Sequence, residues 1–217
     1  MIKTEILKVS TEEQNRQAIL RAAEIVKKGG IISFPTETVY ALGADAMNKQ
    51  AVERIFQIKA RETDKPFAIF VPDYTSLNEF VENISFYAEK LMGEFWPGPL
   101  TLIFKSKPGK LAHLTGGKNK LGFRVSSAEP VQLLLAEIKG PLTATSANLS
   151  GFRESVSAED VYKQFKEKIE LILDGGQSNE PIPSSVVDVS GDIPILIREG
   201  RISIDEFKRV VPRIKII

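Results

Sequence analysis

The sequence predicts a three-layer α/β/α domain of the α+β class, in which a mixed β-sheet lies between helices. Helical and strand-like patterns alternate irregularly along the 217 residues, and no Ser-, Gly- or Pro-rich linker divides them. Some of the expected strands are joined by helices and others by short loops, which favours both parallel and antiparallel pairs. We therefore expect one domain over residues 1–217.

Capping residues, and apolar side chains at spacings of three and four, predict the helices. Thr11 and Gln14 form a capping box before the first helix, and Gly29-Gly30 ends it. Ser203 begins the last helix and Pro212 ends it. The expected helices are residues 11–28, 48–59, 86–94, 130–138, 157–168 and 203–211.

Short apolar runs between glycine, proline or polar residues predict the strands. The run at 100–105 follows Trp96-Pro-Gly-Pro99, whose two prolines cannot continue a helix. The expected strands are residues 31–34, 67–71, 100–105, 121–125, 142–145, 171–173, 185–189 and 195–197.

The composition excludes several kinds of chemistry. The chain has no cysteine, so it holds no disulfide, thiolate nucleophile or iron–sulfur cluster. Its single histidine, His113, excludes a metal site with several histidines, and we interpret it as a loop or surface residue. Any reaction must therefore use lysine, arginine, hydroxyl, amide, carboxylate or backbone groups.

Charge and hydropathy set further limits. The 29 Lys and Arg residues nearly balance 28 Asp and Glu, and the net charge of +1 gives no overall attraction to nucleic acid. No apolar run approaches the ~20 residues of a membrane span, and Met1-Ile-Lys-Thr-Glu5 lacks the apolar stretch of a secretory signal. We expect a cytoplasmic enzyme or binding protein with no membrane contact.

Polar residues gather in four places where a predicted strand meets a turn. In the first, a buried strand leads into Pro35, and Thr36, Glu37 and Thr38 follow. Such side chains often satisfy backbone groups within a turn. Because two hydroxyls and a carboxylate follow a proline that fixes the chain direction, we interpret this turn as facing a ligand.

The second segment is Lys59-Ala-Arg61, with Lys65 just beyond, where cations leave the end of a predicted helix. Cations there complement the helix dipole, which is the simpler explanation. They would also suit an anion site, since arginine offers a planar fork and lysine a mobile charge. The pattern by itself favours the structural explanation.

The third segment, Thr143 to Gly151, follows a strand with small hydroxyl residues, an amide and a glycine. Ser146 and Asn148 would share one side of an extended chain, and Ser155 lies on the loop that follows. Small residues let a ligand approach the backbone, so we interpret this segment as part of a functional site.

The fourth segment places Ser184 and Ser185 before a strand, while Arg124 and Arg198 stand at the ends of two others. Arginines at strand ends are often surface residues with packed stems. Neither common glycine-rich phosphate-binding motif occurs. We interpret residues 116–120 as a flexible loop and a candidate lid.

Together these segments resemble the threonylcarbamoyl-AMP synthase family, whose catalytic domain has the YrdC-like fold. The resemblance runs from about Ile6 to Gly200, with its motifs in the family's order. The motifs are Phe34-Pro-Thr-Glu-Thr-Val-Tyr-Ala-Leu-Gly43, Lys59-x-Arg61, Trp96-Pro-Gly-Pro-Leu-Thr101, Arg124, Ser146-Ala-Asn-Leu-Ser-Gly151, Ser184-Ser-Val-Val-Asp188 and Arg198-Glu-Gly200. It implies a twisted mixed sheet with a positively lined concave site, in the family's single-domain form.

The resemblance implies an L-threonylcarbamoyladenylate synthase, a nucleotidyltransferase that joins L-threonine, bicarbonate or CO2, and ATP, and releases pyrophosphate. The product would feed the threonylcarbamoyladenosine modification of tRNA by a separate transferase. That makes tRNA, or a complex with the transferase, a candidate partner. Mg²⁺ is implied with ATP, held mainly by phosphate oxygens rather than by protein ligands.

The resemblance also implies roles for individual residues. The catalytic, nucleotide-handling quartet matches Lys59, Arg61, Ser146 and Asn148. The ATP contacts match Lys59, Arg61, Asn148, Ser155 and Arg198. The threonine pocket matches Thr36, Arg124, Ser146 and Ser184, with Arg124 pairing with the carboxylate.

The chain departs from the family pattern at three places. Glu62 stands where many members have proline, Lys120 where many have threonine or serine, and Ser126 where members often have proline. Two alternatives remain: an RNA-binding protein on the same fold that makes no adenylate, and a carbamoyltransferase-like module that acts on carbamoyl phosphate.

Overall fold

The computed structural model describes residues 2–10, 12–62, 67–178 and 181–216. Within these residues, eleven strands form one sheet in the order β1-β8-β2-β3-β7-β4-β6-β5-β9-β10-β11. The strands are β1 (Glu5–Lys8), β2 (Ile32–Phe34), β3 (Ala41–Gly43), β4 (Ala68–Phe70), β5 (Leu100–Lys105), β6 (Lys120–Arg124), β7 (Leu142–Ser146), β8 (Leu171–Asp174), β9 (Ser185–Asp188), β10 (Ile195–Arg198) and β11 (Lys215–Ile216).

Helices connect many of these strands. The α-helices are α1 (Glu12–Lys27), α2 (Lys49–Lys59), α3 (Phe86–Phe95), α4 (Glu129–Ile138), α5 (Ala158–Phe165) and α6 (Ile204–Val210), and the 3₁₀ helices are η1 (Thr75–Glu79) and η2 (Ala112–Leu114). Ser85, Ser157 and Ser203 each accept a backbone N–H in the first turn of the helix that follows, and so does Asn48, which was expected inside its helix. Thr11 lies outside the described residues.

The sheet is mixed, as predicted. Strand β2 pairs parallel with β8 and antiparallel with β3, and β6 pairs parallel with β4 and antiparallel with β5. The order interleaves early and late strands, because β7 lies between β3 and β4. Segments far apart in the sequence therefore meet in the middle of the sheet.

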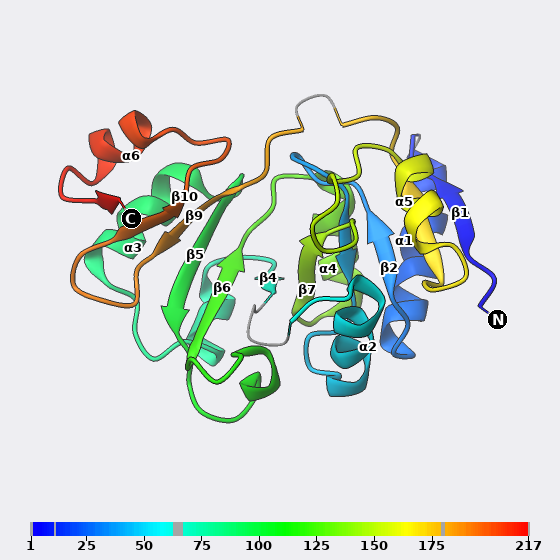
Figure 1. The fold of residues 1–217 in the computed structure, drawn as a ribbon, viewed down its shortest axis with the longest axis horizontal. Coiled ribbons are helices and arrows are strands. Elements are labelled where there is room, and N and C mark those ends of the chain that lie inside the picture. Colours follow the sequence, from blue (N-terminus) through cyan, green and yellow to red (C-terminus); the bar gives the residue numbers. More distant parts are fainter. Residues whose placement is uncertain (1, 11, 63–66, 179–180, 217) are drawn as a thin grey trace.

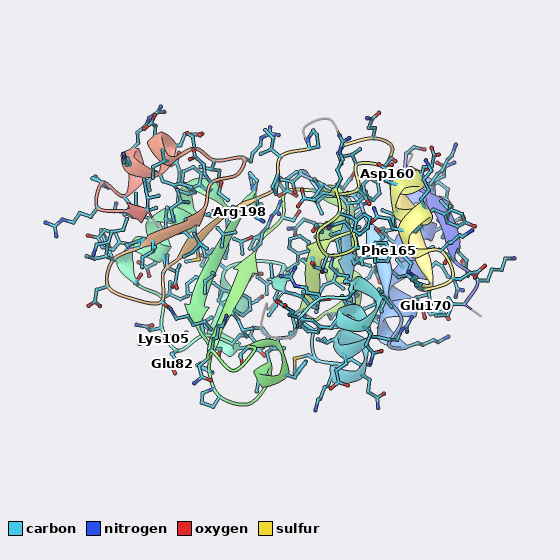
Figure 2. The ribbon with its side chains drawn as sticks, viewed as in Figure 1. Glu82, Lys105, Asp160, Phe165, Glu170 and Arg198 are labelled. Atoms are coloured by element: carbon cyan, nitrogen blue, oxygen red, sulfur yellow. The ribbon has the colours of Figure 1, made fainter. Side chains whose placement is uncertain are left out.

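Side-chain alternation along the strands assigns the helices to two faces. On β8, Leu171 and Leu173 belong to the core beneath α1 and α4, whereas Ile172 belongs to the core beneath α2, α3, α5 and α6. Figure 1 shows α2 and α5 on the near side of the sheet and α1 and α4 on the far side. Phe165 lies between α5 and the sheet (Figure 2). The predicted three layers are confirmed.

The face that carries α1 and α4 is open farther along the sheet, where it bears the cleft described below. On β4, Ala68 and Phe70 point to this face, whereas Ile69 belongs to the opposite core. The small residues Ala68 and Gly122 leave space above the sheet in the cleft. At Gly122 of β6, an added Cβ would come within 3.1 Å of the Thr101 methyl carbon on β5.

The structure differs from the prediction mainly in short elements. Strands β1, β3 and β11 were not expected, and their two to four residues are held by pairing with neighbours rather than by their own pattern. Helix α5 ends at Phe165 instead of residue 168, because the next residues leave the helical conformation and Glu167 has a φ of 62°. No helix in the described ranges is long and apolar enough to span a bilayer.

Candidate functional site

A cleft of about 650 Å³ lies over β4, β5, β6, β7 and β9. Six of the nine residues that the sequence nominated line it, and each comes from a different segment of the chain. These six are Thr36, Arg61, Arg124, Ser146, Ser184 and Arg198. The interleaved strand order brings them together, since Thr36 follows β2 while Ser184 precedes β9.

Arg124, the last residue of β6, is fixed on several sides. Its side chain is only 6% exposed, and its Nε donates to the Gly98 carbonyl at 3.0 Å. Its Nη2 pairs with Glu37 Oε1 at 2.9 Å, and its guanidinium lies 5.5 Å from the centre of the Phe70 ring. Within the described residues its Nη1 makes no hydrogen bond, which leaves that nitrogen for a ligand in the cleft.

Glu37 is the fixed partner of Arg124. Its carboxylate also accepts hydrogen bonds from Ser126 Oγ at 2.5 Å and from the Ser127 backbone N–H at 3.1 Å. Burial raises the pKa of Glu37, but the charge of Arg124 and the bonds from Ser126 and Arg124 outweigh burial, so the pKa lies below its usual value. Glu37 is therefore ionised at neutral pH and orients Arg124.

Hydroxyl groups share the cleft with Arg124, whose Nη2 also donates to Thr38 Oγ1 at 3.5 Å. Thr36 Oγ1 donates to the Val39 carbonyl at 2.8 Å, which holds the turn that the sequence predicted to face a ligand. Ser184 Oγ lies 3.2 Å from Thr101 Oγ1 and accepts from Arg198 Nη2 at 3.3 Å. Both hydroxyls line the cleft.

Two further guanidinium groups line the same cleft. Arg61 follows α2, and its guanidinium lies 5.4 Å from the centre of the Phe67 ring. Arg198 ends β10 and donates to the Ser184 carbonyl through Nε at 3.1 Å and Nη2 at 2.7 Å; Figure 2 shows it near the ends of β5 and β6. The predicted cation Lys65 lies outside the described residues.

Lys59, Asn148 and Ser155 do not line the cleft in the described part of the chain. Lys59 is 1% exposed, and its ammonium donates to the Ser146 and Asn148 carbonyls. Burial lowers the pKa of Lys59 to about 7, with Arg61 acting in the same direction and Glu154 opposing it. Asn148 and Ser155 are buried as well and bond to their own loop.

The cleft also contains residues that the sequence did not nominate. Glu154 lines it and makes no hydrogen bond or ion pair with a described residue. Lys120 and Asp188 form a 2.8 Å ion pair across β5. Burial raises the pKa of Asp188, but bonds from Lys120 and Ser190 outweigh burial and lower it. The period-two alternation from Arg124 and Ser184 would have placed Lys120 and Asp188 on this face.

Outside the cleft, His113 belongs to the 3₁₀ helix η2 and is half-buried, so its interpretation as a loop or surface residue was wrong; its Nε2 lies 2.9 Å from the Ala46 carbonyl. Among the described residues, no three His, Asp or Glu side chains converge as a set of metal ligands. Carboxylate oxygens in the cleft come from Glu154 and Asp188.

The fold and the cleft define the class of protein: an α+β protein whose mixed sheet carries an arginine-lined cleft. The sequence model of the Sua5/YciO/YrdC family, described as "Telomere recombination", matches residues 24–200. The chain therefore belongs to the Sua5/YciO/YrdC family, and the predicted resemblance is confirmed.

Named relatives agree with this assignment. The threonylcarbamoyl-AMP synthase of Pyrococcus abyssi is 37% identical over 195 residues, which cover 90% of this chain and 57% of that protein. A putative threonylcarbamoyl-AMP synthase of Methanocaldococcus jannaschii is 33% identical over 213 residues, which cover 96% of this chain and 99% of that protein. The chain thus spans little more than half of the first relative and nearly all of the second.

A solved structure shows the same fold. The crystal structure of P. abyssi Sua5 complexed with L-threonine superposes with a TM-score of 0.92 at 35% identity, covering 99% of this chain and 62% of that one. The predicted YrdC-like fold, a large twisted sheet flanked by helices, is therefore confirmed.

Proposed function

We propose that the chain is an L-threonylcarbamoyladenylate synthase. In this reaction L-threonine, CO2 or bicarbonate, and ATP give threonylcarbamoyl-AMP and pyrophosphate. The names of the relatives support this function over the two alternatives.

The observation that carries the proposal is that Arg124 opens on the same cleft as Arg61 and Arg198. Arg124 is oriented by Glu37 and shares the cleft with the hydroxyls of Thr36 and Ser184, a setting that suits the carboxylate and hydroxyl of a small amino acid. The other two guanidinium groups suit the phosphates of a nucleotide. The volume of about 650 Å³ lies within the usual range of small-molecule sites.

The reaction brings two anions together, the carbamate of threonine and the polyphosphate of ATP. The unprotonated amine of threonine attacks the carbon of CO2, and a carbamate forms with loss of one proton. A carbamate oxygen then attacks the α-phosphorus of ATP, the bond from that phosphorus to its bridging oxygen breaks, and pyrophosphate leaves. Guanidinium groups in a cleft stabilise the charge on both reactants and hold them in line.

The cleft divides this work between two groups of residues. Arg124, Thr36 and Ser184 would bind threonine, and Arg61 and Arg198 would draw charge from the β- and γ-phosphates. Ser146 lies in the same cleft, at the end of the central strand β7, and would face the reacting groups. Lys59, Asn148 and Ser155 belong to the site through the loop that begins at Ser146.

Mg²⁺ would accompany ATP. The carboxylates that line the cleft fit a cation held mainly by phosphate oxygens: Asp188 is paired with Lys120, and Glu154 is the oxygen ligand that would join the phosphates. When bound, the ion neutralises phosphate charge.

We further propose that the chain acts in the cytoplasm and supplies its product to a separate tRNA-modifying transferase. A mixed anhydride of a carbamate and AMP is reactive towards water, so rapid transfer to that enzyme would preserve it. Direct contact of the chain with tRNA or with the transferase is part of this proposal.

The direct test is pyrophosphate release in the presence of ATP, Mg²⁺ and bicarbonate, with and without L-threonine. We expect release that requires threonine and a product with the mass of threonylcarbamoyl-AMP. L-Alanine serves as a control, because it has the carboxylate but lacks the hydroxyl. Pyrophosphate release at the same rate with and without threonine would contradict the proposal.

A thermal-shift series separates the alternatives, since a ligand that binds only the folded chain raises its melting temperature. ATP with threonine should give the largest shift. A shift with tRNA alone that disappears with salt would favour the RNA-binding alternative. A shift with carbamoyl phosphate, and none with threonine, would favour the carbamoyltransferase-like module.

A further inference from the structure

Three of the nominated nucleotide-binding residues form one network behind the cleft wall. Lys59 ends α2, and Asn148 and Ser155 lie on the loop after β7. All three are at most 8% exposed. Their polar groups contact the chain between residues 146 and 155, which we call the 146–155 loop.

Lys59 contacts this loop through both its side chain and its backbone. The ammonium donates to the carbonyl of Ser146 and, at 2.6 Å, to that of Asn148. The Lys59 carbonyl accepts the Ser150 N–H at 3.0 Å. Three hydrogen bonds thus join the end of α2 to this loop, and Lys59 and Asn148 are 89 positions apart in the sequence.

Asn148 and Ser155 fasten the same loop from within. Asn148 Nδ2 donates to the Leu149 and Phe152 carbonyls at 3.0 and 2.7 Å, and its Oδ1 accepts from Ser146 Oγ at 2.5 Å. Ser155 Oγ donates to the Ala147 carbonyl. Side chains rather than backbone ladders thus accept or donate most of the loop's hydrogen bonds.

The loop in turn supplies two side chains to the cleft, Ser146 at its beginning and Glu154 near its end. Ser146 Oγ is oriented by Asn148, whose own carbonyl is held by Lys59. A change at Lys59 therefore reaches the cleft through the position of Ser146. Both hydrogen bonds of the Lys59 ammonium go to backbone carbonyls.

We propose that Lys59 is a positioning residue, whose ammonium holds the Ser146 and Asn148 carbonyls and so places Ser146 and Glu154 in the cleft. This inference rests on the proposed function for its catalytic consequence. Its structural part concerns the loop alone and is measurable without any substrate.

The first experiment compares Lys59→Met with Arg61→Met, a matched pair in which one cation lies behind the cleft wall and the other lines it. Hydrogen–deuterium exchange of the amides in residues 147–155 is measured without ligands. We expect Lys59→Met to speed this exchange at least tenfold and Arg61→Met to leave it unchanged. If Lys59→Met folds poorly, Ser155→Ala replaces it as a milder change in the same loop, and it should also speed the exchange.

The second experiment measures turnover and binding. For Lys59→Met we expect kcat to fall at least tenfold while the Kd for threonine rises less than tenfold, because Ser146 is displaced but Thr36, Arg124 and Ser184 are untouched. A general structural defect would weaken threonine binding as strongly as Arg124→Gln does.

Chemical rescue gives a control that is specific for position 59. The wild-type chain has no cysteine, so an introduced cysteine is the only one that can be alkylated. Lys59→Cys, alkylated with bromoethylamine in denaturant and refolded, carries an aminoethyl thioether of nearly lysine length at this position alone. Slow exchange of the loop and at least half of kcat should return. Alkylation with iodoacetamide, which adds a neutral amide, should restore neither.

Unchanged loop exchange in Lys59→Met together with lost ATP affinity would overturn the inference, since Lys59 would then contact the nucleotide directly. If the wild-type chain makes no threonine-dependent pyrophosphate, the proposed function fails, while the exchange measurements still decide the role of Lys59 in the loop.

Discussion

The two walls of the cleft use polar residues in opposite ways. On the wall around Arg124, charged and hydroxyl side chains line the cleft and are fixed by partners behind them, above all Glu37. On the wall formed by the 146–155 loop, Lys59, Asn148 and Ser155 are themselves the partners behind, and they bond to backbone carbonyls. Residues of similar chemistry thus either line the cleft or hold the backbone behind it, and burial together with the bonding partner decides which.

Arg124 should give the largest effect. In Arg124→Gln we expect the Kd for threonine to rise more than 100-fold, because the cation for the carboxylate is lost. The free energy of unfolding should fall by about 3 kcal/mol, since Glu37 is left buried without its counter-charge. Calorimetric titration and urea unfolding measure the two quantities. Arg198→Gln is the control, and similar threonine affinity in both variants would contradict the assignment.

Glu37 should give the next effect, through Arg124. In Glu37→Gln, Arg124 keeps the Gly98 carbonyl and the Phe70 ring but loses its ion pair. We expect a roughly tenfold weaker affinity for threonine and a loss of about 2 kcal/mol in stability. Ser126→Ala removes one bond to the same carboxylate and should do less. An unchanged affinity would mean that the other contacts orient Arg124 without Glu37.

The same pair predicts a pH dependence of stability. The pKa of Glu37 is lower in the folded chain than its value of 4.5 when unperturbed. Its stabilising contribution is therefore complete above about pH 4.5 and is lost as the pH falls through the folded-state pKa. Urea unfolding at pH 7, 5, 4 and 3 should show the gap between wild type and Glu37→Gln shrinking only below pH 5. A constant gap would contradict this.

The Lys120–Asp188 pair should give the smallest effect. Lys120 is 43% exposed, so solvent weakens its ion pair. We expect Lys120→Met to lower stability by less than about 1 kcal/mol and to change the KM for ATP by no more than about threefold. Steady-state kinetics and urea unfolding check both. A tenfold change in KM would place Lys120 among the direct nucleotide contacts.

The longer elements could be predicted from local patterns. The serines at 85, 157 and 203 predict where three helices begin, because each serine side chain accepts a backbone N–H in the first turn. Strand β3 was missed because Ala41-Leu42-Gly43 has no strand pattern of its own and is held between β2 and β7. Such pairing depends on segments distant in the sequence.

The candidate site was predictable in its residue types and only partly in its geometry. Arg124, Ser184 and Arg198 line the cleft because each stands at or next to the end of a strand on the open face. Lys59 has the same residue type as a phosphate ligand, and its burial against the loop follows from how α2 and β7 meet. No local sequence pattern encodes this contact between α2 and β7.

The interleaved strand order also fixes when the cleft comes into being. Ser184 reaches Thr101 across 83 positions, and Thr4 reaches the Ile169 carbonyl across 165. Contacts between residues so far apart require long loops to close, so we expect them to slow folding. A chain still emerging from the ribosome has neither Ser184 nor Arg198 beside Arg124, so it cannot hold both proposed substrates together. Substrate binding would therefore distinguish finished molecules from incomplete ones.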